Sequence, residues 1–524
     1  MEIQDLSREV EVECEVRGGP AYRINSWPIW TAAAIYVVLV ALLHPFYRYH
    51  INPDATAYDS LAQKWASGDW TPAITGHWAP LLTWLLAIAH KLGLGLFAAI
   101  TIIDAVASIT LLAALDRVCK ELSLSDGRRF VALSLASVWV VAFTFDDITP
   151  DTLLCASLTW YLAICLKGDF LWSTRQACWL GLVAGIAYLI KPYAIYFIAL
   201  HLAIVVAARL RRHPVRRVIW MRSCATLAGV ALCFVALWVG AMSFRYHRFT
   251  TGSIGSMSLR LMSPRWPSNY VNNIGLVEPP NKTAVSYWED PEVDKLGLPS
   301  WSPLESVNSF RYYLRWVGGN AARLLLWFAV ASLAAIPLLF LVVREWKRVG
   351  YPLAIGLLVL AIILYPAGYI LLVVANRYFW PTAIWLIVLA AYIVPLRKSS
   401  LIALLLVWIS FLPYPLWCLS ADLRQGTAEH AIGTAARRHG LNGTAASINE
   451  WHRSLYVSYY AGLQYCGTTA ATSGPQVGQE LKKLEIKYLI IWPGATVDRN
   501  LIDHIHEIAD PDFRPARIYA LADR

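Results

Sequence analysis

The sequence predicts an α-helical polytopic membrane protein that carries a small α/β domain after its last membrane span. The chain has 524 residues, of which 57% are hydrophobic and only 15% charged, and its mean hydropathy is +0.47. Soluble proteins carry about 25% charged residues. Long apolar runs also recur along most of the chain. These observations exclude a disordered chain, a disulfide-dense secreted scaffold and an ordinary cytosolic enzyme.

Apolar runs predict the membrane spans, each of which needs about 20 apolar residues with some tolerance. Eleven runs qualify, near 27–45, 96–115, 130–146, 152–166, 177–190, 193–208, 223–243, 321–343, 352–374, 378–396 and 400–418. A further run at 80–90 is too short and too broken for a span. We expect it to form an amphipathic helix at the membrane interface.

Basic residues predict the orientation of these spans. They cluster in alternate gaps, most densely at 209–222, whereas the other short gaps hold few. By the positive-inside rule the basic gaps face the cytoplasm. The prediction is a cytoplasmic segment 1–26, a transmembrane domain 27–418 with outer loops 46–95 and 244–320, and an outer domain 419–524. Residues 1–26 are polar and mostly acidic, unlike a cleavable signal peptide.

The net charge of +10 fits basic cytoplasmic loops and predicts no nucleic-acid partner, since no basic patch interleaves with aromatic residues. Nine cysteines show no CxxC pair and no zinc-ligand spacing. Cys418 and Cys466 both fall in the predicted outer part, where a disulfide between them is one alternative.

The outer tail alternates strand-like stretches with helix-like stretches. Residues 445–449 and 487–492 are typical of strands, and 453–463 and 479–484 are typical of helices. This alternation predicts a small α/β domain.

The first outer loop carries a carboxylate just above the predicted membrane surface. Asn52-Pro-Asp opens a predicted helix, with Asp54 near its first turn and Tyr58 and Leu61 on a face that could lie on the membrane. A carboxylate there suits general-base work on a hydroxyl. The residue types alone favour the alternative, in which Asp54 caps the helix.

Charged residues also mark the outer ends of later spans. Lys191 and Arg377 each stand beside an apolar run, where a lone cation either marks a site or reaches the lipid headgroups. Arg245 and Arg248 are weaker candidates, because they could equally bind headgroups. The carboxylates between the third and fourth spans, Asp146, Asp147 and Asp151, need solvent, a cation or a metal ion beside them.

Four further stretches follow the first loop in a fixed order. In that loop, Asp54 and Tyr58 precede Gly-Asp-Trp at 68–70 and Pro-Leu-Leu-Thr-Trp at 80–84. Then come Thr-Pro-Asp at 149–151, a glycine-rich span ending in Lys-Pro at 191–192, Arg-Tyr-His-Arg at 245–248 and Arg-Tyr-Phe-Trp-Pro at 377–381. Together, over 27–400, they resemble the motifs of GT-C glycosyltransferases, nearest to the bacterial aminoarabinose transferases and protein O-mannosyltransferase-like enzymes. Each motif alone is weak.

The resemblance implies a GT-C fold with about eleven transmembrane helices and periplasmic interfacial helices. It also implies transfer of a sugar from a polyprenyl-phosphate donor to a lipid, glycan or protein hydroxyl at the outer face of a bacterial inner membrane, with inversion. Asp54 would be the general base and Asp151 a second catalytic carboxylate. The donor phosphate would lie near Lys191 and Arg377. Substrate-binding roles are implied for Tyr58, Asp147, Arg245, Arg248 and Tyr378. His77 departs from the family pattern: it could bind a metal ion or a hydroxyl, but its residue type alone favours an ordinary surface histidine.

One departure from the family pattern and two rival interpretations remain. Where the aminoarabinose transferases carry Glu-Lys-Pro, this chain has His77-Trp-Ala, so that donor sugar is in doubt. No cofactor is required by the implied mechanism, and whether a divalent cation takes part is open. One rival is a transporter or lipid flippase, but these place polar residues near the membrane midplane, often in inverted repeats, and none is visible here. The other rival is a structural scaffold that presents the tail domain, which gives no reason for the placement of the carboxylates and cations.

Overall fold

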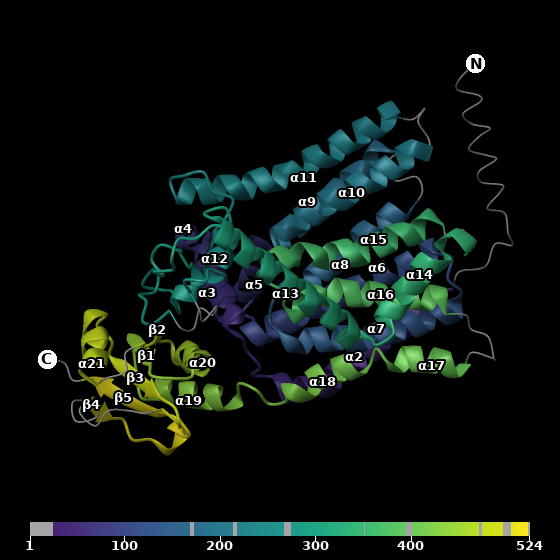
Figure 1. Cartoon of the computed structure of the whole chain (residues 1–524). Helices are drawn as coiled ribbons and strands as arrows, with labels where there is room; N and C mark the ends of the chain where they lie inside the picture. The colour runs from purple at the N-terminus through teal and green to yellow at the C-terminus, as the bar shows by residue number, and fades with distance from the viewer. Residues whose placement is uncertain are drawn as a thin grey trace.

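The computed structural model describes residues 25–167, 172–212, 217–266, 274–349, 352–394, 401–470, 474–495 and 505–521. The predicted cytoplasmic segment 1–26 therefore lies, except for its last two residues, outside the described residues. Long helices lie side by side in a bundle, and the outer-loop helices and the tail domain gather at one end of it (Figure 1). The protein is mainly α-helical, as the sequence predicts.

Every predicted span coincides with helical structure. The helices are α2 (Trp27–Tyr47), α6 (Leu96–Glu121), α7 (Asp126–Asp146), α8 (Asp151–Leu166), α9 (Thr174–Ile190), α10 (Tyr193–Arg212), α11 (Arg217–Arg245), α13 (Val307–Ala331), α14 (Ala335–Val349), α15 (Leu353–Ala367), α16 (Trp380–Ile393), α17 (Leu401–Ile409) and α18 (Pro413–Ala421). Among the described residues, six helices are long and apolar enough to cross a membrane by themselves, or seven with the bent pair α13 and α14. Helices α8, α9 and the 405–421 stretch are apolar but shorter.

The predicted span at 321–343 is bent in the structure. Helices α13 and α14 meet at an angle of 99°. The hydroxyl of Ser332 accepts the N–H of Ala334 at 3.1 Å and pairs with the Ser410 hydroxyl at 2.6 Å. Such side-chain bonds compete with the helical ladder. Pro337 then fits only near the start of a new helix, because it lacks an N–H. The predicted span 400–418 falls on α17 and α18, which follow each other closely as one apolar stretch, 405–421, with Pro413 opening α18.

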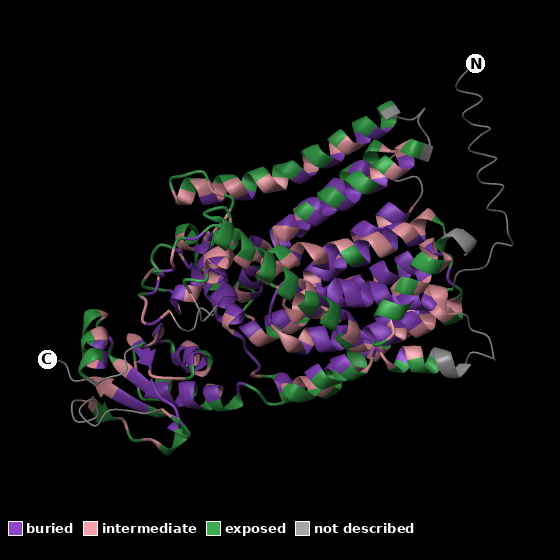
Figure 2. Ribbon diagram, in the orientation of Figure 1, coloured by how far each residue is buried: buried purple, intermediate pink, exposed green. Residues whose placement is uncertain are grey.

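Two glycines let α9 approach α11 closely. A Cβ atom at Gly181 would come within 2.7 Å of the Leu227 carbonyl oxygen, and one at Gly185 within 2.3 Å of the Phe234 ring. Small residues are the usual means by which membrane helices come together. The buried residues concentrate in the bundle interior and in α3, while α11 alternates exposed and partly exposed residues with a few buried ones (Figure 2).

The first outer loop forms α3 (Pro53–Ser67), the short α4 (Trp70–Ala73) and α5 (Pro80–Lys91). The predicted interfacial helix at 80–90 is thus a helix. The expectation that Tyr58 and Leu61 face the membrane is wrong. Both are buried in a cluster with Trp78, Trp451 and Tyr465, because the tail domain covers that face of α3. The second outer loop supplies α12 (Ile254–Leu261) and the 3-10 turn η3 (Tyr287–Glu289).

The tail folds as the predicted α/β domain. Its elements are α19 (Thr427–Arg438), β1 (Thr444–Ser447), α20 (Trp451–Ala461), β2 (Gln464–Thr468), α21 (Gly474–Lys483), β3 (Tyr488–Ile491), β4 (Ile505–Glu507), η7 (Pro511–Phe513) and β5 (Arg517–Leu521). The sheet order is β2-β1-β3-β5-β4, with β1 parallel to β2 and β3, and β5 antiparallel to β3 and β4. Strand β2 is therefore an edge strand. Cys418 and Cys466 are both buried and free, so the alternative disulfide does not form.

Candidate active site

Helix α3 presents Asp54 in its first turn. The helix begins with Asn52, whose side-chain oxygen accepts the N–H of Ala55 at 3.1 Å, and Pro53 occupies the first helical position. Asn52, not Asp54, is thus the N-cap, which leaves both oxygens of Asp54 free for other partners.

Arg377 joins three carboxylates that lie far apart in the sequence. It lies in the 3-10 turn η5 (Asn376–Phe379), just before α16. Its Nη2 lies 2.9 Å from Oδ2 of Asp54, its Nη1 3.5 Å from Oδ2 of Asp147, and its Nε 3.7 Å from Oδ2 of Asp151. Asp147 follows α7 and Asp151 opens α8. One guanidinium thus brings together the ends of α3, α7, α8 and α16.

Lys191 forms the second cationic contact of the cluster. It follows the last residue of α9 in extended backbone geometry, and its Nζ lies 2.6 Å from Oδ1 of Asp151. The same Nζ lies 4.1 Å from the centre of the Tyr378 ring, which stacks on Tyr369. A cation over an aromatic face is attracted to the ring. Lys191 therefore points into the cluster in this structure and does not extend toward lipid headgroups.

The cluster holds more negative than positive side chains. Three carboxylates, Asp54, Asp147 and Asp151, face the two cations Arg377 and Lys191. Burial raises the pKa of Asp147, while Arg377 opposes that rise. A proton on Asp147 would balance the charges. The fourth predicted neighbour, Asp146, accepts a hydrogen bond from the Asn376 side chain at 3.2 Å instead.

Aromatic side chains enclose the other side of Asp54. The indole Nε1 of Trp288 donates to Oδ1 of Asp54 at 3.1 Å. The His77 ring lies 5.1 Å from Trp288 and 4.6 Å from Trp78, and Tyr58 lies 4.8 Å from Trp78, all between ring centres. Sequence reasoning missed Trp288, because it belongs to a long loop without a local motif.

His77 and Tyr58 differ in the proton that each can offer. Burial lowers the pKa of His77 to about 4, against the opposing effect of Asp54, so the ring is neutral near pH 7. Its Nδ1 is buried and has no hydrogen-bond partner in the described part of the chain. Burial, and next the charge of Asp54, raise the pKa of Tyr58 well above its usual value. A neutral imidazole and a phenol therefore border the carboxylate, and both are able to bind hydroxyl groups.

Arg245 and Arg248 do not join this cluster. Arg245 pairs with Asp290, with 2.8 Å between Nη2 and Oδ2, and the Tyr246 hydroxyl donates to the same carboxylate at 2.7 Å. Arg248 lines a separate cavity of about 220 Å3 beside α12, whose lining includes Arg260 and Ser253 but none of the carboxylates around Arg377. The grouping of these two arginines with Lys191 and Arg377 is not what the structure shows.

A metal ion has no evident cage here. Within the described ranges, no group of three or more His, Cys, Asp or Glu side chains is arranged to hold one. Asp54, Asp147 and Asp151 each contact the guanidinium of Arg377.

No protein-family model and no curated protein sequence matches the chain. Several solved structures match the chain in fold. ArnT from Cupriavidus metallidurans in the apo state matches with a TM-score of 0.56 and 16% identity, over 94% of this chain and 97% of that one. ArnT bound to undecaprenyl phosphate matches with a TM-score of 0.53, 14% identity and the same coverage. The Archaeoglobus fulgidus oligosaccharyltransferase in complex with Zn and sulfate matches at 0.54 and 12% identity, over 88% of this chain and 67% of that one. This chain therefore has the GT-C fold, the fold of polytopic membrane glycosyltransferases.

Proposed function

We propose that the protein is an integral membrane glycosyltransferase. It moves a sugar from a polyprenyl-phosphate donor to an acceptor hydroxyl at the outer face of a bacterial inner membrane, with inversion at the anomeric carbon. The observation that carries this proposal is the cluster in which Arg377 contacts Asp54 at 2.9 Å, beside Lys191 and Asp151. A carboxylate and two cations at the outer ends of membrane helices are the groups that such a reaction requires.

Asp54 is the general base of this proposal. It takes the proton of the acceptor hydroxyl as the hydroxyl oxygen forms its bond to the anomeric carbon. The bond between that carbon and the phosphate oxygen breaks, and the polyprenyl phosphate leaves with the electron pair. No covalent enzyme intermediate is needed, because one displacement with inversion completes the transfer.

Lys191 and Arg377 stabilise the leaving phosphate. Arginine makes paired hydrogen bonds to phosphate oxygens and keeps its charge. Both cations contact carboxylates in the structure, so the donor phosphate takes over part of these contacts when it binds. Support for a lipid-phosphate ligand comes from the likeness to ArnT, which was solved bound to undecaprenyl phosphate.

Asp151, Asp147, Tyr58, Tyr378 and His77 complete the proposed site. Asp151 holds Lys191 and lies near Arg377, so it orients both phosphate-binding groups. Tyr378 lies under Lys191. The free Nδ1 of His77 and the hydroxyl of Tyr58 are suited to hydroxyls of the donor sugar or of the acceptor, which is a lipid, glycan or protein.

The test is sugar transfer by membranes that contain wild-type protein or Asp54→Asn, with a panel of radiolabelled polyprenyl-phosphate sugars. The substitution keeps the shape of the side chain and removes the base. We expect a loss of about a hundredfold or more in rate, with donor binding retained. Asp69→Asn, an exposed carboxylate just after the same helix, is the matched control. Equal transfer by wild type and Asp54→Asn would contradict the mechanism.

A wild type that consumes no donor from a broad panel would instead favour the transporter alternative. Direct binding of each lipid donor to purified protein then separates the two functions, because a transporter binds and releases its lipid without transferring the sugar.

A further inference from the structure

The stretch 276–290 of the second outer loop connects the tail domain to Asp54, and we call it the bridging segment. At its start, the N–H of Val277 donates to the Cys466 carbonyl of β2 at 2.7 Å. Further along, the Val285 carbonyl accepts the N–H of Tyr465 at 2.7 Å. The segment thus pairs with the free edge of the tail sheet, where unpaired backbone groups are available.

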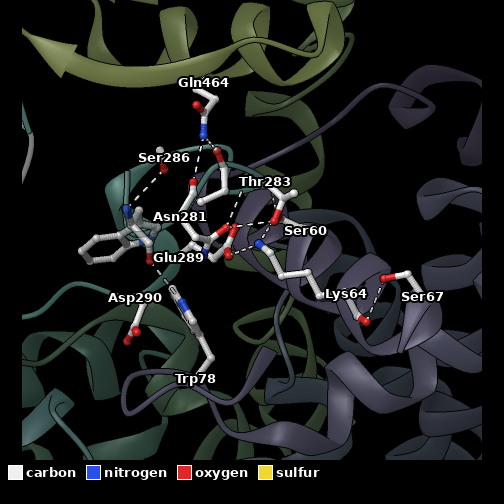
Figure 3. Close-up of polar contacts among 12 residues, drawn as sticks. Ser60, Lys64, Ser67, Trp78, Asn281, Thr283, Ser286, Glu289, Asp290 and Gln464 are labelled. Atoms are coloured by element: carbon white, nitrogen blue, oxygen red, sulfur yellow. Dashed lines mark hydrogen bonds and ion pairs between the residues drawn. The ribbon is translucent and has the colours of Figure 1, made fainter. Parts of the chain in front are cut away.

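One tail side chain fastens the turn of this segment. The side-chain amide of Gln464 donates to the carbonyl oxygens of Asn281 at 2.9 Å and of Ala284 at 3.0 Å. Figure 3 shows Gln464 pointing from the tail strand toward Asn281. The bridging segment therefore takes its position from the tail domain through both backbone and side-chain contacts.

The far end of the segment is fastened to α3. Lys64 of α3 forms an ion pair with Glu289, and the two side chains are only 4% and 1% exposed (Figure 3). The indole of Trp78 donates to the carbonyl oxygen of Trp288 at 3.1 Å. Trp288 is thus held through its own carbonyl and through its neighbour Glu289, and its indole donates to Asp54.

We propose that Trp288 is a positioning residue for Asp54, and that the tail domain acts on the site through the bridging segment. This inference rests on the proposed function, in which Asp54 is the base. Oδ2 of Asp54 contacts Arg377 and Oδ1 contacts Trp288. When the donor phosphate draws on Arg377, the indole N–H remains to hold the carboxylate plane. The tail thereby sets the orientation of the base without touching it.

A second contact between the tail and α3 supports this arrangement. The Tyr459 hydroxyl of α20 donates to Asp59 at 2.8 Å, one turn beyond Asp54 on the same helix. Asp59 also meets His90 of α5 at 2.8 Å. The tail domain therefore contacts both α3, which carries Asp54, and the bridging segment, which orients Asp54.

The first experiment compares Trp288→Phe with wild type in kcat, KM and pH dependence. Phenylalanine keeps a ring and removes the N–H. A hydrogen bond to a charged group typically contributes enough for about a tenfold or larger change, so we expect kcat to fall about tenfold and KM for the donor to stay within about twofold. In wild type, the indole hydrogen bond favours the ionised form of the carboxylate. Its loss in Trp288→Phe should therefore move the acid limb of the kcat profile to higher pH.

Trp301→Phe is the matched control for this comparison. Trp301 belongs to the same outer loop and is buried, and its Nε1 has no hydrogen-bond partner within the described ranges. If Trp288 had only a structural role, Trp288→Phe would lower kcat without moving the acid limb, or would lower the amount of folded protein. Either result would overturn the inference.

The role of the tail is tested by Gln464→Ala and by its combination with Trp288→Phe. We expect Gln464→Ala to lower kcat by several fold and to move the acid limb in the same direction. In the double variant the two effects should not add, because both act through one contact. Additive effects would overturn the link between tail and base. If Asp54→Asn retains full activity, the proposed function fails; if Asp54→Asn is inactive and Trp288→Phe behaves as wild type, only this inference fails.

Discussion

Helix α3 contributes to two charged clusters, and the two differ in how well positive and negative charges are matched. Lys64 and Glu289 form a one-to-one pair that is almost fully buried, at 4% and 1% exposure. The cluster around Asp54 has three carboxylates for two cations, and Arg377 and Asp147 remain 21% and 30% exposed. In a buried ion pair, each charge offsets the desolvation cost of the other. Under the proposed function, the Asp54 cluster exchanges a protein contact for a substrate phosphate, which suits its partial exposure and its unequal numbers of carboxylates and cations.

The largest effect is expected from breaking the buried pair. Glu289→Gln leaves the Lys64 ammonium buried without a counter-charge, and such losses cost about 3–5 kcal/mol. We expect a lower temperature of thermal unfolding for Glu289→Gln in detergent or nanodiscs. Replacing both partners, as in Lys64→Met with Glu289→Leu, should recover most of the stability that Glu289→Gln loses. If the double variant is as unstable as the single one, the pair is not the source of the stability.

A smaller effect, and of a different kind, is expected in the cluster. Lys191→Met removes the charge that we propose binds the phosphate, and it also deprives Asp151 of a close partner. Since hydrogen bonds to charged groups contribute about 1.5–3 kcal/mol, we expect donor affinity to fall roughly tenfold or more. Thermal stability should change less than in Glu289→Gln. Lys91→Met, an exposed lysine at the end of α5, is the control. An unchanged donor affinity in Lys191→Met would argue against a phosphate role.

The pH dependence of stability offers a finer test, at His90 and Asp59. The hydrogen bond to Asp59 raises the pKa of His90, against the lowering effect of burial. A raised pKa in the folded state means that the contact stabilises fully below the unfolded value of about 6.5. That contribution is lost as pH rises through the folded value. We expect the wild-type unfolding temperature to fall across this window and His90→Gln to show a flatter profile; equal profiles would contradict the assignment.

The smallest effect is expected from chelation of divalent ions. The guanidinium of Arg377 contacts Asp54, Asp147 and Asp151. We therefore propose that transfer in excess EDTA stays within about twofold of transfer in Mg2+ or Mn2+, since a guanidinium already neutralises the carboxylates. A loss that is restored by one added divalent cation would show that the cluster rearranges around a metal.

Much of the fold follows from local sequence. Apolar runs occur at eleven places, and helices appear at all of them, because a helix satisfies its own backbone in lipid. Six of these helices, or seven with the bent pair, are long and apolar enough to cross a membrane within the described residues. The alternating tail likewise predicted the α/β domain, although not its β2, β4 and β5 strands. The order of motifs along the chain indicated the GT-C fold and drew attention to Asp54, Lys191 and Arg377.

The sequence by itself therefore determined the helices, the fold class and the residue types available at their outer ends. Only the tertiary structure decided which of these residues meet. It placed Arg377 against Asp54, diverted Arg245 to Asp290, made Asn52 the cap and brought Trp288 to the carboxylate. The reason is physical: span length and capping chemistry act over a few residues, whereas ion pairs depend on where distant helix ends converge once the bundle and the tail have docked.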